Sequence, residues 1–203
     1  DVQDEFIDEK DFNALYLMGE CYRKLGNPDN AIKSYSCALN AKEDPKAYYK
    51  RGTVYFSIDN LDEAAINYEE AIYLKENYHQ AYESLGILSQ SLNDEDSAIE
   101  NFKLALEYDP RNYQCWFRLS SLYNDVGEKY NDNEMYQLAK ECAEECLMIK
   151  RSYLAAYFEI GRAEYGLGRK FAAITNFEKA RNDSQYRKIS DSKIKDIQKE
   201  LSE

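Results

Sequence analysis

The chain has 203 residues, with 38 Asp and Glu against 26 Lys and Arg, so its formal net charge is −12. This balance disfavours nucleic acid as a partner, because affinity for phosphates comes largely from Lys and Arg. No apolar run approaches the roughly 18 residues that a membrane-spanning helix needs, so we expect no membrane insertion. Only three prolines occur, which leaves long stretches free to be helical.

The N-terminal sequence and the cysteines bear on processing and location. The chain begins at Asp1 rather than Met, which suggests a part of a longer protein. Residues 1–11 are expected to be an acidic extension or the end of a preceding repeat. Five cysteines, an odd number without regular spacing, indicate reduced thiols rather than a disulfide framework. We therefore expect a cytoplasmic location.

A short motif that ends in a small residue recurs along the chain. Its first copy is Tyr16-Leu17-Met18-Gly19, and the small residues that end the five copies are separated by 33, 34, 34 and 41 positions: Gly19, Gly52, Gly86, Ser120 and Gly161. Such regular spacing predicts a repeat architecture, in which each unit cannot bury its apolar face alone and must stack on its neighbours.

Each copy is followed by three residues spaced four and then three apart, which places them on one helical face. Four of these sets consist of an alanine, an aromatic residue and a second alanine: Ala31, Tyr35 and Ala38; Ala64, Tyr68 and Ala71; Ala98, Phe102 and Ala105; Ala173, Phe177 and Ala180. The fourth unit has Ala139, Ala143 and Cys146 and lacks the aromatic. Each unit therefore predicts two amphipathic helices, with a small residue on the first helix facing an aromatic residue on the second.

This pattern resembles the tetratricopeptide repeat family, whose period is about 34 residues. Its clearest expression is in the third unit, at Tyr82, Leu85, Gly86, Ala98, Phe102, Ala105 and Pro110. The resemblance implies an all-α, right-handed superhelical solenoid of about five helical hairpins. The acidic charge and the small-to-aromatic spacing disfavour the two rival interpretations, a pentatricopeptide RNA reader and generic helical hairpins.

In chain order, we expect five repeats and a C-terminal helix that caps them. The repeats are expected at residues 12–45, 45–78, 79–112, 113–153 and 154–187, and the capping helix at residues 188–203. The spacing of 41 in the fourth repeat, against 34 before it, places seven extra residues around Glu128–Tyr136. These residues form a longer turn, extended helices or a projection that contacts a partner. The alternative for the tail is a helix for self-association.

In this family the first helix of each hairpin faces a concave groove. Projecting the family's groove positions onto the chain places an aromatic residue at one position in four units: Tyr16, Tyr49, Phe117 and Phe158. Aromatic side chains combine large contact area with low rotamer entropy, which favours them as anchors for a bound segment. The alternative is that these rings pack sideways between repeats.

The projected groove positions are more basic than the chain as a whole. They include six basic residues (Arg23, Lys24, Lys46, Lys50, Arg118 and Arg162) and four acidic residues (Glu20, Glu83, Asp125 and Glu159), a net charge of +2 against −12 for the chain. Unless the charges are scattered by chance, this lining favours an acidic or carboxylate-bearing ligand. The predicted partner-binding residues are Tyr16, Lys46, Tyr49, Lys50, Phe117, Arg118, Phe158 and Arg162.

Lys46 and Lys50 also resemble part of the carboxylate clamp with which some family members hold the C-termini of heat-shock chaperones. The clamp pattern requires Asn where this chain has Leu17, so the match is incomplete. We therefore expect an acidic partner without assigning it to the chaperones.

The sequence offers no recognisable catalytic site. His79 is the only histidine, and no glycine-rich nucleotide-binding motif is present. Cys142 and Cys146 lie one helical turn apart, but zinc needs two more ligands. We expect no enzymatic activity, no metal and no cofactor. The predicted function is a scaffold that binds a partner protein or peptide in the groove. The alternatives are a structural, self-associating subunit (a homo-oligomer) and a targeting arm of an enzyme whose catalytic domain lies outside the chain.

Overall fold

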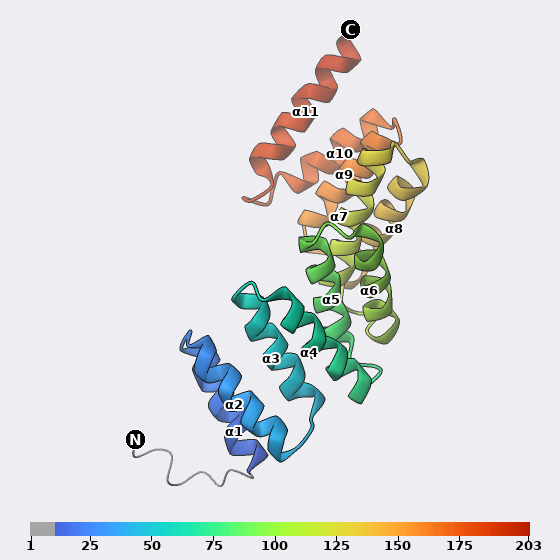
Figure 1. Ribbon diagram of the computed structural model, residues 1–203. Helices are drawn as coiled ribbons and strands as arrows, with labels where there is room; N and C mark the ends of the chain where they lie inside the picture. Colours follow the sequence, from blue (N-terminus) through green and yellow to red (C-terminus); the bar gives the residue numbers. More distant parts are fainter. Residues whose placement is uncertain (1–10) are drawn as a thin grey trace. The chain divides into compact units, whose positions relative to one another are not determined.

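The computed structural model describes residues 11–203, which divide into two compact units at Tyr108 (Figure 1). Unit 1 comprises described residues 11–108 and unit 2 comprises residues 109–203. Unit 1 contains α1 (Phe12–Lys24), α2 (Pro28–Ala41), α3 (Pro45–Ser57), α4 (Leu61–Leu74), α5 (His79–Ser91) and α6 (Glu95–Tyr108). Unit 2 contains α7 (Tyr113–Tyr130), α8 (Asn133–Ile149), α9 (Ala155–Gly166), α10 (Lys170–Ala180) and α11 (Arg187–Ser202).

The helices pair into five antiparallel hairpins, each formed by two consecutive helices from α1 to α10. The expected N-terminal extension at residues 1–11 lies outside the described residues except for Asp11. The Asp11 side chain caps α1 by accepting hydrogen bonds from the backbone N–H groups of Asn13 and Ala14, at 3.0 and 3.2 Å. This contact satisfies two of the amide groups that a helix N-terminus leaves without intrahelical partners.

The turn inside each hairpin follows one backbone scheme. One residue adopts the left-handed conformation, at Gly26 (φ 69°), Asp59 (61°), Asn93 (59°), Asn131 (53°) and Gly168 (75°). In the first four turns, the next residue is Asn or Asp, and its side chain caps the second helix. Glycine, Asn and Asp tolerate positive φ, and Asn and Asp are good N-caps, so these dipeptides both end the first helix and start the second.

Glycine against an aromatic ring sets the packing of four hairpins. The four pairs are Gly19 with Tyr35, Gly52 with Tyr68, Gly86 with Phe102, and Gly161 with Phe177. A Cβ atom added to any of these glycines would lie 2.7 or 2.8 Å from the ring, closer than van der Waals contact allows. The four rings are at most 2% exposed. Each small residue therefore admits the ring of the second helix, as the sequence pattern predicts.

The fourth hairpin reaches close packing by a different route. The additional residues lengthen both helices, to 18 residues in α7 and 17 in α8, against 13 and 14 in the first hairpin. In place of the missing aromatic at Ala143, the ring of Tyr136 packs against Gly127 of α7 and Gly166 of α9. At the position of the usual glycine, the hydroxyl of Ser120 donates a buried hydrogen bond of 2.7 Å to the backbone carbonyl of Ala139.

Helix α11 covers the fifth hairpin by packing against α10. Its Ile194 and Ile197 join a buried cluster with Phe158 and Phe177. Ile197 is 1% exposed, whereas Leu201 near the end of the helix is 42% exposed. The apolar spacing of this helix thus buries its central turns against the last hairpin.

Candidate functional site

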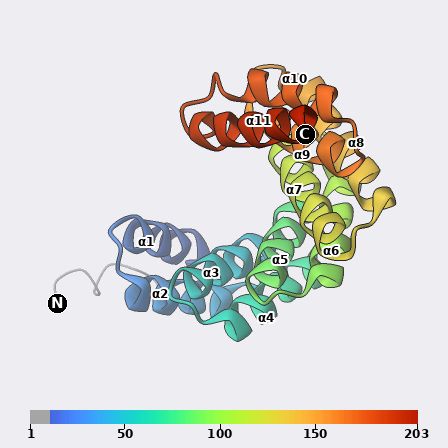
Figure 2. The same cartoon turned by 90° about the horizontal axis from the view of Figure 1, so that it is seen from above.

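In unit 1, the first helices of the hairpins (α1, α3 and α5) form one side and the second helices (α2, α4 and α6) form the other (Figure 2). We call the exposed and half-buried side chains of α1, α3 and α5 that include Leu17, Glu20, Lys46, Tyr49, Lys50 and Ser84 the first-helix face of unit 1. Lys50 lowers the pKa of Glu20 through its charge, and Tyr49 hydrogen-bonds Ser84. These interactions connect α1 with α3 and α3 with α5.

The predicted aromatic residues of this face pack mainly against other rings of their own unit. The ring centroid of Tyr16 lies 5.8 Å from that of Tyr35. The Tyr49 centroid lies 5.9 Å from Tyr68 and 5.3 Å from Tyr78, and burial raises the pKa of Tyr49. Both Tyr16 and Tyr49 are half-buried. Their rings therefore pack within and between hairpins, and only part of each side chain remains for a partner.

Of the predicted basic residues of this face, Lys46 is more accessible than the rings, whereas Lys50 is half-buried like them. Lys46, in the first turn of α3, is exposed. Lys50, one turn later, places its ammonium 5.8 Å from the centroid of the Tyr49 ring. On α1, Leu17 is 60% exposed. It lies one turn before Glu20, whose pKa is lowered by the charge of Lys50. The face thus presents two lysines and an unburied leucine.

Glu20 already has partners within α1 and α2. Its carboxylate accepts hydrogen bonds from Nε and Nη2 of Arg23, at 3.2 and 3.0 Å, and a short one from the hydroxyl of Tyr35. Burial acts to raise the pKa of Glu20, but these hydrogen bonds and the charge of Lys50 outweigh it and lower the pKa. Arg23 is therefore engaged by its own chain, whereas Lys24 and Lys46 are exposed and Lys50 is half-buried.

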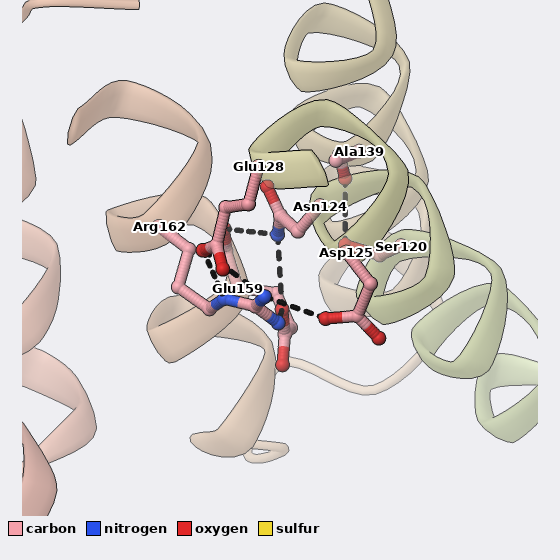
Figure 3. Close-up of polar contacts among 7 residues, drawn as sticks. All are labelled: Ser120, Asn124, Asp125, Glu128, Ala139, Glu159 and Arg162. Atoms are coloured by element: carbon pink, nitrogen blue, oxygen red, sulfur yellow. Dashed lines mark hydrogen bonds and ion pairs between the residues drawn. The ribbon is translucent and has the colours of Figure 1, made fainter. Parts of the chain in front are cut away.

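In unit 2, Arg162 of α9 is the centre of an ion-pair cluster with carboxylates of α7 and α9 (Figure 3). Its Nη2 lies 2.6 Å from Asp125 and 3.1 Å from Glu128, and its Nη1 lies 3.0 Å from Glu159. The side chain is only 13% exposed. The guanidinium predicted to bind a partner joins two helices of its own unit, where three carboxylates accept its hydrogen bonds.

Glu159, the inner member of this cluster, is 3% exposed. Its Oε2 accepts a hydrogen bond of 2.9 Å from the side-chain amide of Asn124, which also donates to the backbone carbonyl of Glu159 at 3.0 Å (Figure 3). Burial raises the pKa of Glu159, although the charge of Arg162 and the hydrogen bonds oppose this shift. The buried ion pair of Glu159 with Arg162 lies within α9, and the hydrogen bonds from Asn124 to Glu159 join α7 to α9.

The other predicted residues of unit 2 differ in accessibility. Phe158 is 6% exposed, with its ring centroid 5.4 Å from Phe177 and 5.1 Å from Tyr186. This burial places Phe158 in the core under α11. Phe117 is half-buried, with its ring edge-on to Tyr153 at 5.2 Å. Arg118 is exposed.

The net positive charge of the projected groove positions comes from unit 1 alone. There, Arg23, Lys24, Lys46 and Lys50 outnumber Glu20 and Glu83. In unit 2, the two arginines at these positions, Arg118 and Arg162, are balanced by Asp125 and Glu159. Glu128 adds a further carboxylate beside Arg162. The excess of positive charge at these positions therefore lies on the first-helix face of unit 1 and not at the Arg162 cluster.

The thiols and carboxylates offer no sign of a metal centre. All five cysteines are free, and burial raises the pKa of the Cys146 thiol to about 11, which leaves it protonated and unreactive at neutral pH. Within residues 11–203, no group of three or more His, Cys, Asp or Glu side chains is placed to bind a metal ion. Over the same residues, none of the helices combines the length and apolar character required to cross a bilayer.

Comparison with known families identifies the repeats. Tetratricopeptide repeat family models match residues 12–44, 45–78 and 79–112. The chain belongs to the tetratricopeptide repeat superfamily, whose members generally act as non-catalytic interaction scaffolds. No curated protein matches the sequence.

Solved structures agree with this assignment at the level of the fold. The crystal structure of the MamA protein matches with a TM-score of 0.73 and 24% identity, over 83% of this chain and 89% of that one. A tetratricopeptide repeat protein from Parabacteroides merdae matches with a TM-score of 0.76 and 16% identity, over 92% and 72%. YrrB, described as a tetratricopeptide repeat protein with an unusual peptide-binding site, matches with a TM-score of 0.71 and 17% identity, over 86% and 87%. The predicted all-α fold of the tetratricopeptide solenoid class is confirmed.

Proposed function

We propose that the chain is a non-catalytic scaffold that binds an extended or helical segment of a partner protein on the first-helix face of unit 1. The observation that carries this proposal is the pair Lys46 and Lys50, one helical turn apart on a face that also exposes Leu17. Two ammonium groups attract an anionic side chain or a terminal carboxylate, and the leucine accepts an apolar side chain of the same segment.

The remaining predicted residues contribute in different ways to this proposal. Tyr16 and Tyr49 are half-buried, so part of each side chain remains for contact with a partner. In unit 2, Phe117 and Arg118 are accessible enough to contact a partner, whereas Phe158 and Arg162 act through the fold. The peptide-binding site named for YrrB supports a peptide ligand as the general class. A cytoplasmic location completes the proposal, supported by five free thiols that suit a reducing compartment.

Reversing both charges, with Lys46→Glu and Lys50→Glu, is expected to weaken the binding of an acidic, leucine-containing peptide at least about tenfold, equivalent to roughly 1.4 kcal/mol. The peptide is first selected against the wild-type chain from an array of acidic and apolar ten-residue sequences. Affinity is then measured by fluorescence anisotropy at two salt concentrations. Salt is expected to weaken wild-type binding, because exposed charges are screened.

The matched control is Lys33→Glu with Lys195→Glu, which makes the same change of net charge at exposed positions outside this face. The control is expected to bind within about twofold of the wild type, and both variants are expected to unfold within about 0.5 kcal/mol of it, as surface substitutions usually do. An equal loss in the control, or unchanged affinity in the Lys46 and Lys50 variant, would contradict the proposal.

Self-association through α11 is a second candidate function. Ile189 and Leu201 on this helix are 46% and 42% exposed, and both are apolar. Sedimentation velocity over a range of concentrations is expected to show dimers that Ile189→Ser with Leu201→Ser abolishes. Deleting α11 would be a poor test, because it would uncover Phe158 and Phe177. A chain that stays monomeric at all concentrations would exclude this candidate.

A further inference from the structure

Helix α4 in unit 1 exposes two large apolar side chains on the side away from the first-helix face. Ile66 is 50% exposed and Tyr73 is 85% exposed. They are seven residues apart, which is close to two helical turns, so both project from the same side of α4. The opposite side of this helix packs into the core through Ala64, Tyr68 and Ala71. Ile66 and Tyr73 therefore form an apolar pair that contributes little to the stability of unit 1.

The surroundings of this apolar pair are strongly acidic. Asp62, Glu63, Glu69 and Glu70 are all exposed on α4, and no basic residue occurs between Leu61 and Leu74. The flanking second helices add to the charge, because their exposed acidic residues (Asp29 on α2; Asp96, Glu100 and Glu107 on α6) outnumber their exposed basic residues (Lys33 and Lys103). The second-helix side of unit 1 thus carries the charge opposite to that of Lys46 and Lys50.

The apolar pair and the carboxylates around it together specify the chemistry of a segment that would bind here. Carboxylates on both sides of an apolar pair favour lysine and arginine, and disfavour an acidic segment by like-charge repulsion. The exposed ring of Tyr73 offers its face to a cation, and the aliphatic stems of Lys and Arg pack well against an isoleucine. An acidic surface without apolar anchors would attract cations unselectively, whereas Ile66 and Tyr73 require apolar groups at matching positions in the bound segment.

We propose that the outer face of α4 binds a basic, amphipathic segment of a partner protein. Ile66 and Tyr73 anchor its apolar side chains, and the acidic pairs Asp62–Glu63 and Glu69–Glu70 bind its Lys and Arg residues. This surface is separate from the first-helix face and takes a ligand of the opposite charge. The chain then connects two partners, one acidic and one basic, on the two sides of a single unit.

The test uses a fluorescent 14-residue helical peptide with lysines on one face and leucines on the other. A second peptide with the same composition, permuted so that it has no apolar face, measures attraction by charge alone. The wild-type chain is expected to bind the amphipathic peptide at least tenfold more tightly than the permuted one. Ile66→Ser with Tyr73→Ser, which leaves the charge unchanged, is expected to abolish that preference.

Charge reversal supplies the second arm of the experiment. Glu69→Lys with Glu70→Lys is expected to weaken binding at least tenfold, whereas Glu134→Lys with Glu178→Lys, the same change at exposed positions of unit 2, is expected to weaken it less than twofold. The single variant Tyr73→Ser, at a position that is 85% exposed, preserves the test if the double serine variant folds poorly.

Three outcomes would overturn the proposal. Equal losses in both charge-reversal variants would show unselective attraction to an acidic protein. Unchanged affinity in the serine variants would show that the apolar pair does not take part. If sedimentation shows self-association that Tyr73→Ser abolishes, the occupant of this face is a second copy of the chain. Because none of these measurements involves Lys46 or Lys50, their failure is separable from failure of the proposed function.

Discussion

Replacing Gly86 of α5 with valine is expected to destabilise unit 1 by about 3 kcal/mol or more, at the upper end of the range for overpacked cores. A Cβ at this position would lie 2.7 Å from two atoms of the Phe102 ring, and that ring is fully buried. Because Phe102 has no space into which to move, the two helices of the third hairpin must separate. Chemical denaturation followed by circular dichroism measures the loss.

Two further variants isolate steric overlap as the cause. Gln80→Val, at an exposed position of the same helix, controls for the weak helix propensity of valine and is expected to cost less than about 1 kcal/mol. Combining Gly86→Val with Phe102→Ala is expected to cost clearly less than the sum of the two single changes, because the added methyl groups fill part of the space that the ring leaves. Additive losses in the double variant would contradict the explanation.

The repeat fold is visible in the sequence because its determinants are local and periodic. Gly86, Ala98, Phe102 and Ala105 show both which helices pair and how closely, since each is close in sequence to its contact. The fourth hairpin departs from this pattern at Ser120, where glycine becomes serine. The same hairpin lacks the aromatic at Ala143, and Tyr136, outside the usual register, supplies the ring instead, so the sequence could show only that an aromatic was missing.

The orientation of the aromatic rings was harder to predict. A ring on the first helix can face a partner or its neighbours, and the spacing that places it on that helix is the same in both cases. The structure places Phe158 in the core because Tyr186, at the start of the C-terminal segment, covers it. Tyr49 packs against Tyr78, which precedes α5. These contacts depend on connecting segments that carry no repeat signal.

The partners of Arg162 show that ion pairs between hairpins were also hard to predict from the sequence. Glu159 lies three residues away on the same helix, a spacing that already indicates an ion pair. Asp125 and Glu128 lie 37 and 34 residues away on α7, and only the stacking of hairpins brings them to the guanidinium. For Leu17, the sequence showed only that an apolar residue stands where the carboxylate clamp has Asn, and its 60% exposure is seen only in the structure.

The second large effect is expected for Arg162→Met, which should destabilise unit 2 by about 3–5 kcal/mol at neutral pH, as does breaking other buried ion pairs. Methionine retains most of the aliphatic volume but leaves Glu159, 3% exposed, without its cation. Arg169→Met is the control, because Arg169 is 53% exposed in its 3.4 Å pair with Glu164. Glu164 itself is only 6% exposed but keeps Lys140 as a cation at 2.8 Å, so this variant is expected to cost at most about 1 kcal/mol.

The dependence of this loss on pH identifies Glu159 as its source. Burial raises the pKa of Glu159 in the folded state, and removing Arg162 eliminates the main charge that opposes the shift. The folded variant then keeps its Glu159 proton to a higher pH than the unfolded chain, in which the glutamate pKa is about 4.3. The free-energy difference from wild type is expected to be small below that pKa and to grow as pH rises through the raised folded value.

A double variant decides between a buried charge and a loss of packing. Glu159→Gln added to Arg162→Met removes the charge and keeps an amide that can hydrogen-bond Asn124, so it is expected to recover at least half of the lost stability and to flatten the pH dependence. If the double variant is as unstable as Arg162→Met at neutral pH, the loss comes instead from the links of Arg162 to Asp125 and Glu128, which hold α9 to α7. A difference from wild type that stays constant between acid and neutral pH would contradict both accounts, because each rests on an ionised carboxylate.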